Sequence, residues 1–325
     1  MKRRLLLQSA AVLLAQPGHL LAQSEKQFRI GVAVRDSGNP FYPALLAGLR
    51  DLGYVVGRNL IVDTRSALND PSSQPARMSE LIALKPDVLI GLQPSVVEMR
   101  SQTTSIPIVM VLGQDPVAAG LVQSLRRSGT NVTGATAPFV QLLGKHFELL
   151  TEIIPKLSRV AFFNEPLPLT PALADMEEAA KAAAAAKGIR LSFARANDAA
   201  GVARAFAALD KVRPQAIIAP VALNTIRLRD NIIAEARRMR IPAVSAADGE
   251  LWADSGGVLF YGVDIVAAWR RAAAHVDRIL KGANPAELPI EQPTRFLFVV
   301  NQKAAREIGL KIPQSVLFRA DRVIE

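Results

Sequence analysis

The 325-residue sequence contains no cysteine, and this absence excludes several kinds of chemistry. Without a thiol the chain can form no disulfide, no thiolate nucleophile and no cysteine-based zinc site. Lipid attachment at a processed N-terminal cysteine is excluded as well. Aromatic residues make up only 5% of the chain, and none is interleaved with the basic clusters as a platform for single-stranded nucleic acid requires. We therefore expect no nucleic-acid partner.

Histidine is also scarce, and the three that occur are His19, His146 and His275. His146 and His275 have no second histidine or carboxylate at metal-ligand spacing. The sequence therefore favours surface or packing roles, with satisfied hydrogen bonds, for both. It also lacks a glycine-rich phosphate loop and a Gly-x-Ser-x-Gly nucleophile elbow. We expect no enzymatic activity, no metal and no cofactor.

Long apolar runs are missing, except for a short one at the N-terminus. Three basic residues at positions 2–4 precede apolar residues 5–15, and the small residue Ala22 follows. This pattern predicts a signal peptide over residues 1–22. The apolar stretch is shorter than the roughly 20 residues that a membrane helix needs. We expect export to the periplasm by the general secretory or the twin-arginine route, without a lipid anchor.

The charge balance is basic but modest. Without the signal peptide the chain keeps 36 basic and 29 acidic residues, a net charge of +7. The basic residues are scattered near expected helix ends, which favours a solvated surface over a binding patch for an anionic polymer. A mature chain of about 300 residues exceeds the usual size of one core and indicates two domains.

Strand-like and helix-like segments alternate along most of the chain, which is typical of parallel sheets covered by helices. Helices are expected to begin near Pro43, Gln74, Pro94 and Val117, and a further one spans 141–154. The second half repeats the first, since KPDVLIGLQPS and SIPIVMVLGQD are echoed by RPQAIIAPVAL and RIPAVSAADGE. We infer two similar α/β lobes, each a doubly wound, Rossmann-like sheet.

The order of the segments predicts how the chain divides between the lobes. Crossings are expected near 134–138, 261–264 and 291–295, which gives a hinge of three strands. The first lobe then comprises 23–136 plus about 264–290, and the second 137–263 plus about 291–325.

The segment between the second and third crossings predicts its own helix. Asp264 is a suitable N-cap and Gly282 suits the left-handed position after the last turn. Five residues between them recur at helical spacing and predict one buried face: Ile265, Trp269, Ala272, Val276 and Ile279.

This segment, 259–310, also carries a resemblance, together with NPFYPALLAGLRDLGYVVGRNLIVDTR, VLGQDPVAAGLVQSLRRSGTNVTG and KHFELLTEIIPKLSRVAFFN. The four segments resemble the substrate-binding proteins of bacterial ABC importers, in the group that includes tryptophan and tyrosine binders. The resemblance implies a type I periplasmic binding protein of the Venus-flytrap kind. It also implies an inner-membrane ABC permease as partner, and we expect the protein to act as a monomer.

Ligands of open α/β sheets bind beyond the carboxyl ends of the strands. The polar and aromatic residues at these positions form our predicted ligand site: Ser37, Asn39, Phe41, Gln93, Pro94, Ser95, Gln114, Asp115, Asn164, Asn224, Asp248 and Tyr261. Ser95 near a helix start suits a ligand carboxylate, while relatives commonly have Thr-Pro where this chain has Gln93 before Pro94. Asp248 suits a ligand ammonium.

Five of these residues also have a structural alternative. Ser95 could cap its helix, and Asp248 could cap the next one. Asp115 before proline is good turn chemistry. Phe41 could staple a helix to the sheet, and Tyr261 could belong to the hinge.

The resulting expectation is a periplasmic receptor that captures a small solute between two lobes and presents it to a permease. The resemblance makes an amino acid, aromatic or otherwise, or a related small carboxylate the first candidate. The alternative is a periplasmic sensory module that signals to a membrane receptor.

Overall fold

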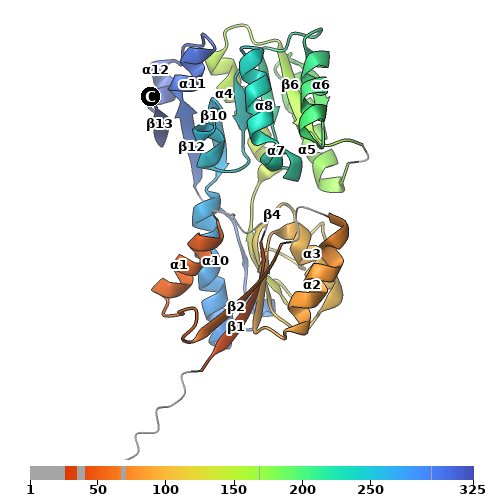
Figure 1. Ribbon diagram of the computed structural model, residues 1–325, viewed down its shortest axis with the longest axis vertical. Coiled ribbons are helices and arrows are strands. Elements are labelled where there is room, and N and C mark those ends of the chain that lie inside the picture. Colours follow the sequence, from red (N-terminus) through yellow and green to blue (C-terminus); the bar gives the residue numbers. More distant parts are fainter. Residues whose placement is uncertain (1–25, 35–40, 67–70, 168, 294) are drawn as a thin grey trace, which may run out of the picture.

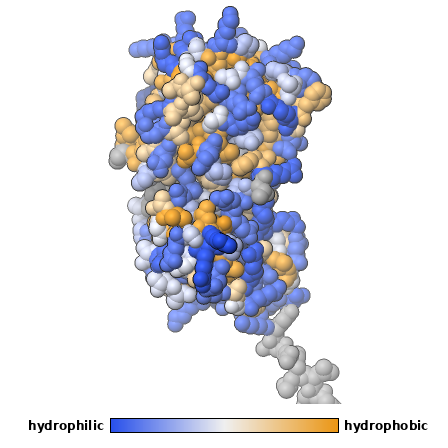
Figure 2. All heavy atoms as spheres, turned by 180° about the vertical axis from the view of Figure 1, so that it is seen from behind, coloured by the Kyte–Doolittle hydropathy of each residue, from blue (hydrophilic) through white to orange (hydrophobic). Residues whose placement is uncertain are grey.

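The computed structural model describes residues 26–34, 41–66, 71–167, 169–293 and 295–325. Two lobes lie one above the other along the long axis of the molecule, and the chain passes between them at a narrow waist (Figure 1). Seen from behind, the surface is mostly hydrophilic, with hydrophobic residues scattered over the upper lobe and a small group near the middle of the molecule (Figure 2). Among the described residues, no helix is long and apolar enough to cross a membrane.

The first lobe is built on a six-stranded parallel sheet with the order β11-β5-β4-β3-β1-β2. Its strands are β1 (Phe28–Val34), β2 (Leu60–Ser66), β3 (Val88–Gly91), β4 (Ile108–Gly113), β5 (Val132–Thr136) and β11 (Ile290–Glu291). Its helices are α1 (Tyr42–Asp51), α2 (Gln74–Ala83), α3 (Gln93–Gln102) and α10 (Ile265–Leu280). Apolar residues of α1 and α10 pack on one face of the sheet, and those of α2 and α3 on the other.

The second lobe contains a seven-stranded sheet with the order β13-β12-β10-β9-β8-β6-β7. Its strands are β6 (Arg159–Asn164), β7 (Arg190–Arg195), β8 (Ala216–Ala219), β9 (Ala243–Ser245), β10 (Leu259–Val263), β12 (Phe296–Asn301) and β13 (Arg322–Ile324). Its helices are α4 (Phe139–Ile153), α5 (Pro171–Ala185), α6 (Ala199–Leu209), α7 (Leu223–Arg227), α8 (Arg229–Arg238), α9 (Glu250–Asp254), α11 (Gln302–Glu307) and α12 (Gln314–Leu317). Helices α4 and α5 pack on one face, and α6, α8 and α9 on the other.

Both sheets are therefore doubly wound, as the alternating pattern predicts. The internal repeat is visible in the backbone. Lys85 and Arg213 both adopt a left-handed φ of 50° before a proline, and a strand begins three residues after each, at Val88 and Ala216. Strand β12 pairs antiparallel with β10 in the second sheet.

Three segments connect the lobes: one between β5 and α4, one at Asp264 and one between β11 and β12. Glu291 pairs with Ala135 in the first sheet, so the third connection begins after it. Phe139, at the start of α4, packs against apolar clusters of both lobes.

Helix α10 has the ends that the sequence predicts. The Asp264 side chain accepts a hydrogen bond from the Ala267 amide at 2.9 Å. After the last turn, Gly282 has a φ of 98°, and the Ala283 amide donates to the Arg278 carbonyl. This is a Schellman closure. All five residues of the predicted face are buried.

One local prediction is wrong, and one strand of the first sheet has no counterpart in the predicted pattern. The helix expected near Val117 is a set of turns, because the Asp115 carboxylate accepts from the Ala118 amide and Gly120 adopts a φ of 68°. Strand β5 was not predicted, since Gly134 and two threonines interrupt its apolar pattern. It is held as a strand by pairing with β4 on one side and β11 on the other.

Candidate functional site

The N-terminus of α3 presents backbone amides at the carboxyl end of β3. Ser95, the third residue of α3, is only 1% exposed, and its hydroxyl accepts from the Gln74 side-chain amide at 3.3 Å. Leu92 occupies the N-cap position, without a side-chain cap. Ser95 therefore does not cap the helix, and the amides of Gln93 and Ser95 are among those that an α-helix leaves without intrahelical partners.

The loop after β4 is fastened to the start of α3. The Gln93 side-chain oxygen accepts from the backbone amide of Gln114. On the other side, the Thr136 hydroxyl lies within hydrogen-bond distance of two carbonyls of this loop, those of Gly113 at 2.7 Å and Gln114 at 2.8 Å. The structure thus brings together two segments of the predicted site, 93–95 and 114–115.

One contact joins the predicted site to the opposite lobe. The Gln114 side-chain amide donates to the carbonyl of Ala172, at the start of α5, at 3.4 Å. The carboxyl-end loop of β4 therefore lies against the second lobe. Asp115, next to Gln114, is exposed and accepts from Ala118, which is the turn role that its sequence also permitted.

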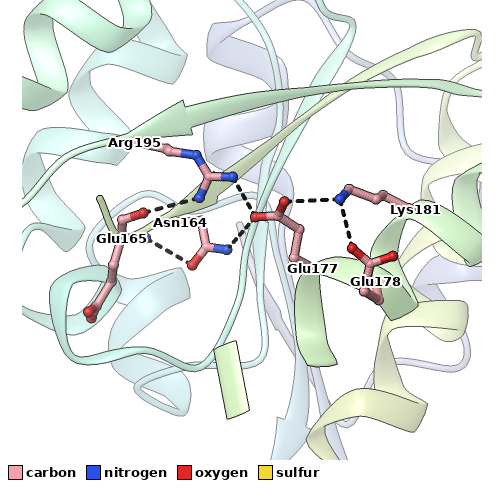
Figure 3. A network of polar contacts seen from close by, with 6 residues as sticks. All are labelled: Asn164, Glu165, Glu177, Glu178, Lys181 and Arg195. Carbon is pink, nitrogen blue, oxygen red and sulfur yellow. Dashed lines mark hydrogen bonds and ion pairs between the residues drawn. The ribbon is translucent and has the colours of Figure 1, made fainter. Parts of the chain in front are cut away.

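In the second lobe, Asn164 belongs to a network of polar contacts (Figure 3). Its side-chain amide donates to the Glu177 carboxylate at 3.0 Å, and its oxygen accepts from the Glu165 amide at 2.8 Å. Asn224 lies beside this network, because its backbone amide donates to the Glu165 carboxylate at 3.3 Å. Asn164 is fully buried. Both ends of its side chain are thus occupied by protein groups.

Asp248 is 2% exposed and forms an ion pair with Arg229, the first residue of α8. It has a left-handed φ of 70°, and the N-cap of α9 is Gly249 rather than Asp248. The alternative role of Asp248 as a helix cap is therefore wrong. A ligand ammonium near Asp248 would share this carboxylate with the Arg229 guanidinium.

The two aromatic residues of the predicted site are packed into protein. Phe41 is buried at the N-cap position of α1 and contributes to the apolar cluster between α1 and α10. The Tyr261 ring lies 5.9 Å from the rings of both Phe296 and Phe298, at the waist. Ser37 and Asn39 lie outside the described residues.

The sequence of this two-lobed chain matches a family model described as ABC transporter substrate binding protein, over residues 32–324. The chain belongs to the ABC transporter substrate-binding protein family. It is 23% identical over 303 residues to the tyrosine-binding protein of Clostridioides difficile (strain R20291), with 89% of this chain and 83% of that protein covered.

Solved structures share the fold of this substrate-binding protein. A conserved domain protein from Vibrio cholerae superposes with a TM-score of 0.80 at 29% identity, over 92% of this chain and 99% of that one. The ABC domain from Streptococcus pneumonia in complex with L-Trp gives a TM-score of 0.79 at 23% identity, over 92% and 100% of the two chains. The predicted type I periplasmic binding protein fold is confirmed.

Glu177 is the partner of Asn164, and Arg195 is the partner of Glu165. Neither Glu177 nor Arg195 belongs to the predicted site. The Arg195 guanidinium donates to the Glu177 carboxylate at 2.6 Å and to the Glu165 carbonyl at 3.2 Å. Burial opposes ionisation of Glu177, but hydrogen bonds from Arg195, Lys181 and Asn164 outweigh it and lower the pKa of this carboxyl. No local pattern marks these residues, because their contacts form only when α5 and β7 pack beside β6.

We expect Glu177→Ala to lower the free energy of unfolding by about 2 kcal/mol, because it removes one partner of a mostly buried charge network. This loss is smaller than for a fully buried ion pair, because Arg195 and Lys181 stay partly exposed to water. Urea denaturation at neutral pH measures the change. The matched control is Glu178→Ala, since that side chain is 72% exposed and should matter by less than about 0.5 kcal/mol. Equal losses in both variants would contradict a structural role for the network.

Proposed function

We propose that this protein is the periplasmic binding component of an ABC importer and captures an amino acid, first of all an aromatic one, or a related small carboxylate. The lobes close on the ligand by bending at the three connections. The contact between Gln114 and Ala172 supports this proposal most directly. It joins a loop at the carboxyl end of one sheet to the opposite lobe. In this arrangement a ligand held by the strand-end loops of one lobe can contact those of the other.

The carboxylate of the ligand is assigned to the start of α3. Backbone amides at a helix N-terminus favour an anion, and α3 has ten residues to supply the dipole. The Ser95 hydroxyl adds a side-chain donor beside these amides. Opposite, the carboxylates of Glu165 and Asp248 are the candidates for an ammonium group, each already in contact with protein donors.

Names of relatives support the ligand class. One relative is called a tyrosine-binding protein, and one structural neighbour is a complex with L-Trp. We further propose that the signal peptide over 1–22 directs export, that an inner-membrane permease is the partner and that the protein acts as a monomer. Ligand shifts such a two-state protein toward closure only by its better affinity for the closed form.

Calorimetry with L-tryptophan, L-tyrosine and L-phenylalanine tests the assignment. We expect Ser95→Ala to weaken binding of the best ligand roughly tenfold, because one hydrogen bond to a charged group is lost. The control is Ser101→Ala in the same helix, whose exposed hydroxyl donates to the Glu98 carbonyl and should be neutral.

Small-angle scattering on the same samples should show a smaller radius of gyration with ligand. Equal affinity of the two serine variants would contradict the carboxylate seat at α3. An unchanged radius of gyration with bound ligand would contradict capture by closure. For import itself, ligand-bound protein should stimulate ATP hydrolysis by the permease encoded with it, and stimulation of a receptor kinase instead would favour the sensory alternative.

A further inference from the structure

A cavity of about 300 Å³ lies in the first lobe beside the hinge. Its walls are the ends of β4 and β5, one face of α10 and the connecting residues after β11. None of the predicted ligand-site residues that the structure describes lines it. The cavity thus has a lining of its own, although Thr136 in its wall also contacts the Gln114 carbonyl. Its volume reaches the lower end of the range for small-molecule sites.

His275 lines this cavity, and its ring nitrogens are buried. Its side chain is 3% exposed, and among the described residues neither ring nitrogen has a hydrogen-bond partner. Its Nε2 lies 3.3 Å from a Glu291 carboxylate oxygen, whose charge opposes the effect of burial on the ring. Burial lowers the pKa of His275, so the neutral ring offers one donor and one acceptor. The expectation of satisfied hydrogen bonds is wrong for this histidine, and buried polar groups without partners are rare.

Arg271 lies one helical turn before His275, on the same face of α10. It is exposed, lines the cavity and makes no ion pair or hydrogen bond with any residue that the structure describes. Its neighbours are engaged, because Arg270 pairs with Asp51, and Arg278 pairs with Glu291 at 3.0 Å. The Glu291 charge is thus offset by Arg278, and the positive charge of Arg271 remains available.

We propose that this cavity is a second ligand site, for a small carboxylate with an apolar body, held between Arg271 and His275. A guanidinium is well suited to bind a carboxylate. Methionine, valine, leucine and alanine side chains of β4, β5 and α10 supply the apolar wall.

One wall of this site belongs to the hinge. Glu291 and Pro293 border the third connection, and Thr136 ends the strand before the first. A ligand here contacts residues that move when the lobes rotate. Its binding is therefore coupled to closure to the extent that its affinity differs between the open and closed forms.

Fluorine NMR with 4-fluorophenylacetate as the probe tests this site on the mature protein. Arg271→Gln and His275→Leu should each weaken probe binding at least tenfold. Arg270→Gln is the matched control, because that guanidinium is engaged with Asp51, and it should leave binding unchanged. His275→Leu should also keep or raise the melting temperature, since it removes an unsatisfied buried polar group, which separates lost binding from lost folding.

No probe binding at millimolar concentration overturns the proposal. So does equal binding by Arg271→Gln, His275→Leu and Arg270→Gln, which would mean that the probe binds elsewhere. A loss of probe binding in Arg271→Gln and His275→Leu is distinguishable from a failure of amino-acid capture, because neither residue belongs to the site assigned to that ligand.

Discussion

Gly134→Ala should lower the free energy of unfolding by about 4 kcal/mol, through overpacking and backbone strain together. Gly134 lies in β5 with a φ of 131°, a conformation that side chains other than that of glycine rarely adopt. A Cβ built at this position would lie 2.0 Å from the carbonyl oxygen of Met110 in the adjacent strand β4. Backbone in the middle of a sheet cannot move aside without breaking the β4–β5 pairing, which joins these two residues directly.

Urea denaturation of Gly134→Ala measures this loss, and Gly144→Ala is the control. Gly144 lies in the exposed surface of α4, and an added Cβ there meets no atom within 4 Å. That substitution should raise the free energy of unfolding by up to about 1 kcal/mol, the difference in helix propensity. Opposite signs for the same chemical change are the expected result. A loss below about 1 kcal/mol for Gly134→Ala would mean that β5 is not held against β4 as described.

The same strand shows where sequence reasoning fails. The apolar pattern predicts β1, β3, β4, β6 and β8 because each of these segments contains enough apolar residues to be recognised as a strand on its own. β5 is specified by its neighbours, through pairing on both edges, and its glycine and threonines carry no strand signal of their own. Helix α10 is the opposite case, because Asp264, Gly282 and a regular buried face are all local features.

The candidate site is predictable in part for the same reason. The rule that ligands bind beyond strand ends selects Ser95 and Gln114 from the order of segments alone, and the structure brings their loops together. The same rule does not predict that Asn164 is hydrogen-bonded to Glu177, or that Asp248 is paired with Arg229. These partners are 13 and 19 residues away in the sequence and meet only after packing. Polar residues at strand ends therefore include some whose side chains are already engaged by other protein groups.

A buried histidine lies beside the hinge. His146 of α4 contacts the Tyr261 carbonyl through Nε2 at 2.8 Å, and its ring lies edge-on to the Tyr261 ring at 6.3 Å. This contact fastens the first helix of the second lobe to the strand that precedes the second connection. Nε2 must carry the proton to donate to a carbonyl, so Nδ1 is unprotonated, and it has no hydrogen-bond partner among the described residues.

Acid should therefore destabilise this protein through His146 in a defined pH window. Burial lowers the pKa of His146 from an ordinary 6.5 to about 4, and the bond to Tyr261 only partly opposes this. Below pH 6.5 the His146 imidazole is protonated in the unfolded chain, whereas in the folded chain it stays neutral until about pH 4. The contribution of His146 to the free energy of unfolding is therefore complete above pH 6.5. It is lost as the pH falls to about 4, by about 3 kcal/mol in total.

Urea denaturation at several pH values between 7 and 4, on the wild type and on His146→Gln, measures this contribution. Glutamine does not titrate and can still donate to the Tyr261 carbonyl, so the difference between the two proteins isolates the imidazole from every other titrating group. The variant should lose about 3 kcal/mol less than the wild type across the window. Parallel losses would contradict the lowered pKa of His146 in the folded chain. Because His146 contacts the strand that leads into the hinge, the same experiment with ligand present would show whether protonation also weakens closure.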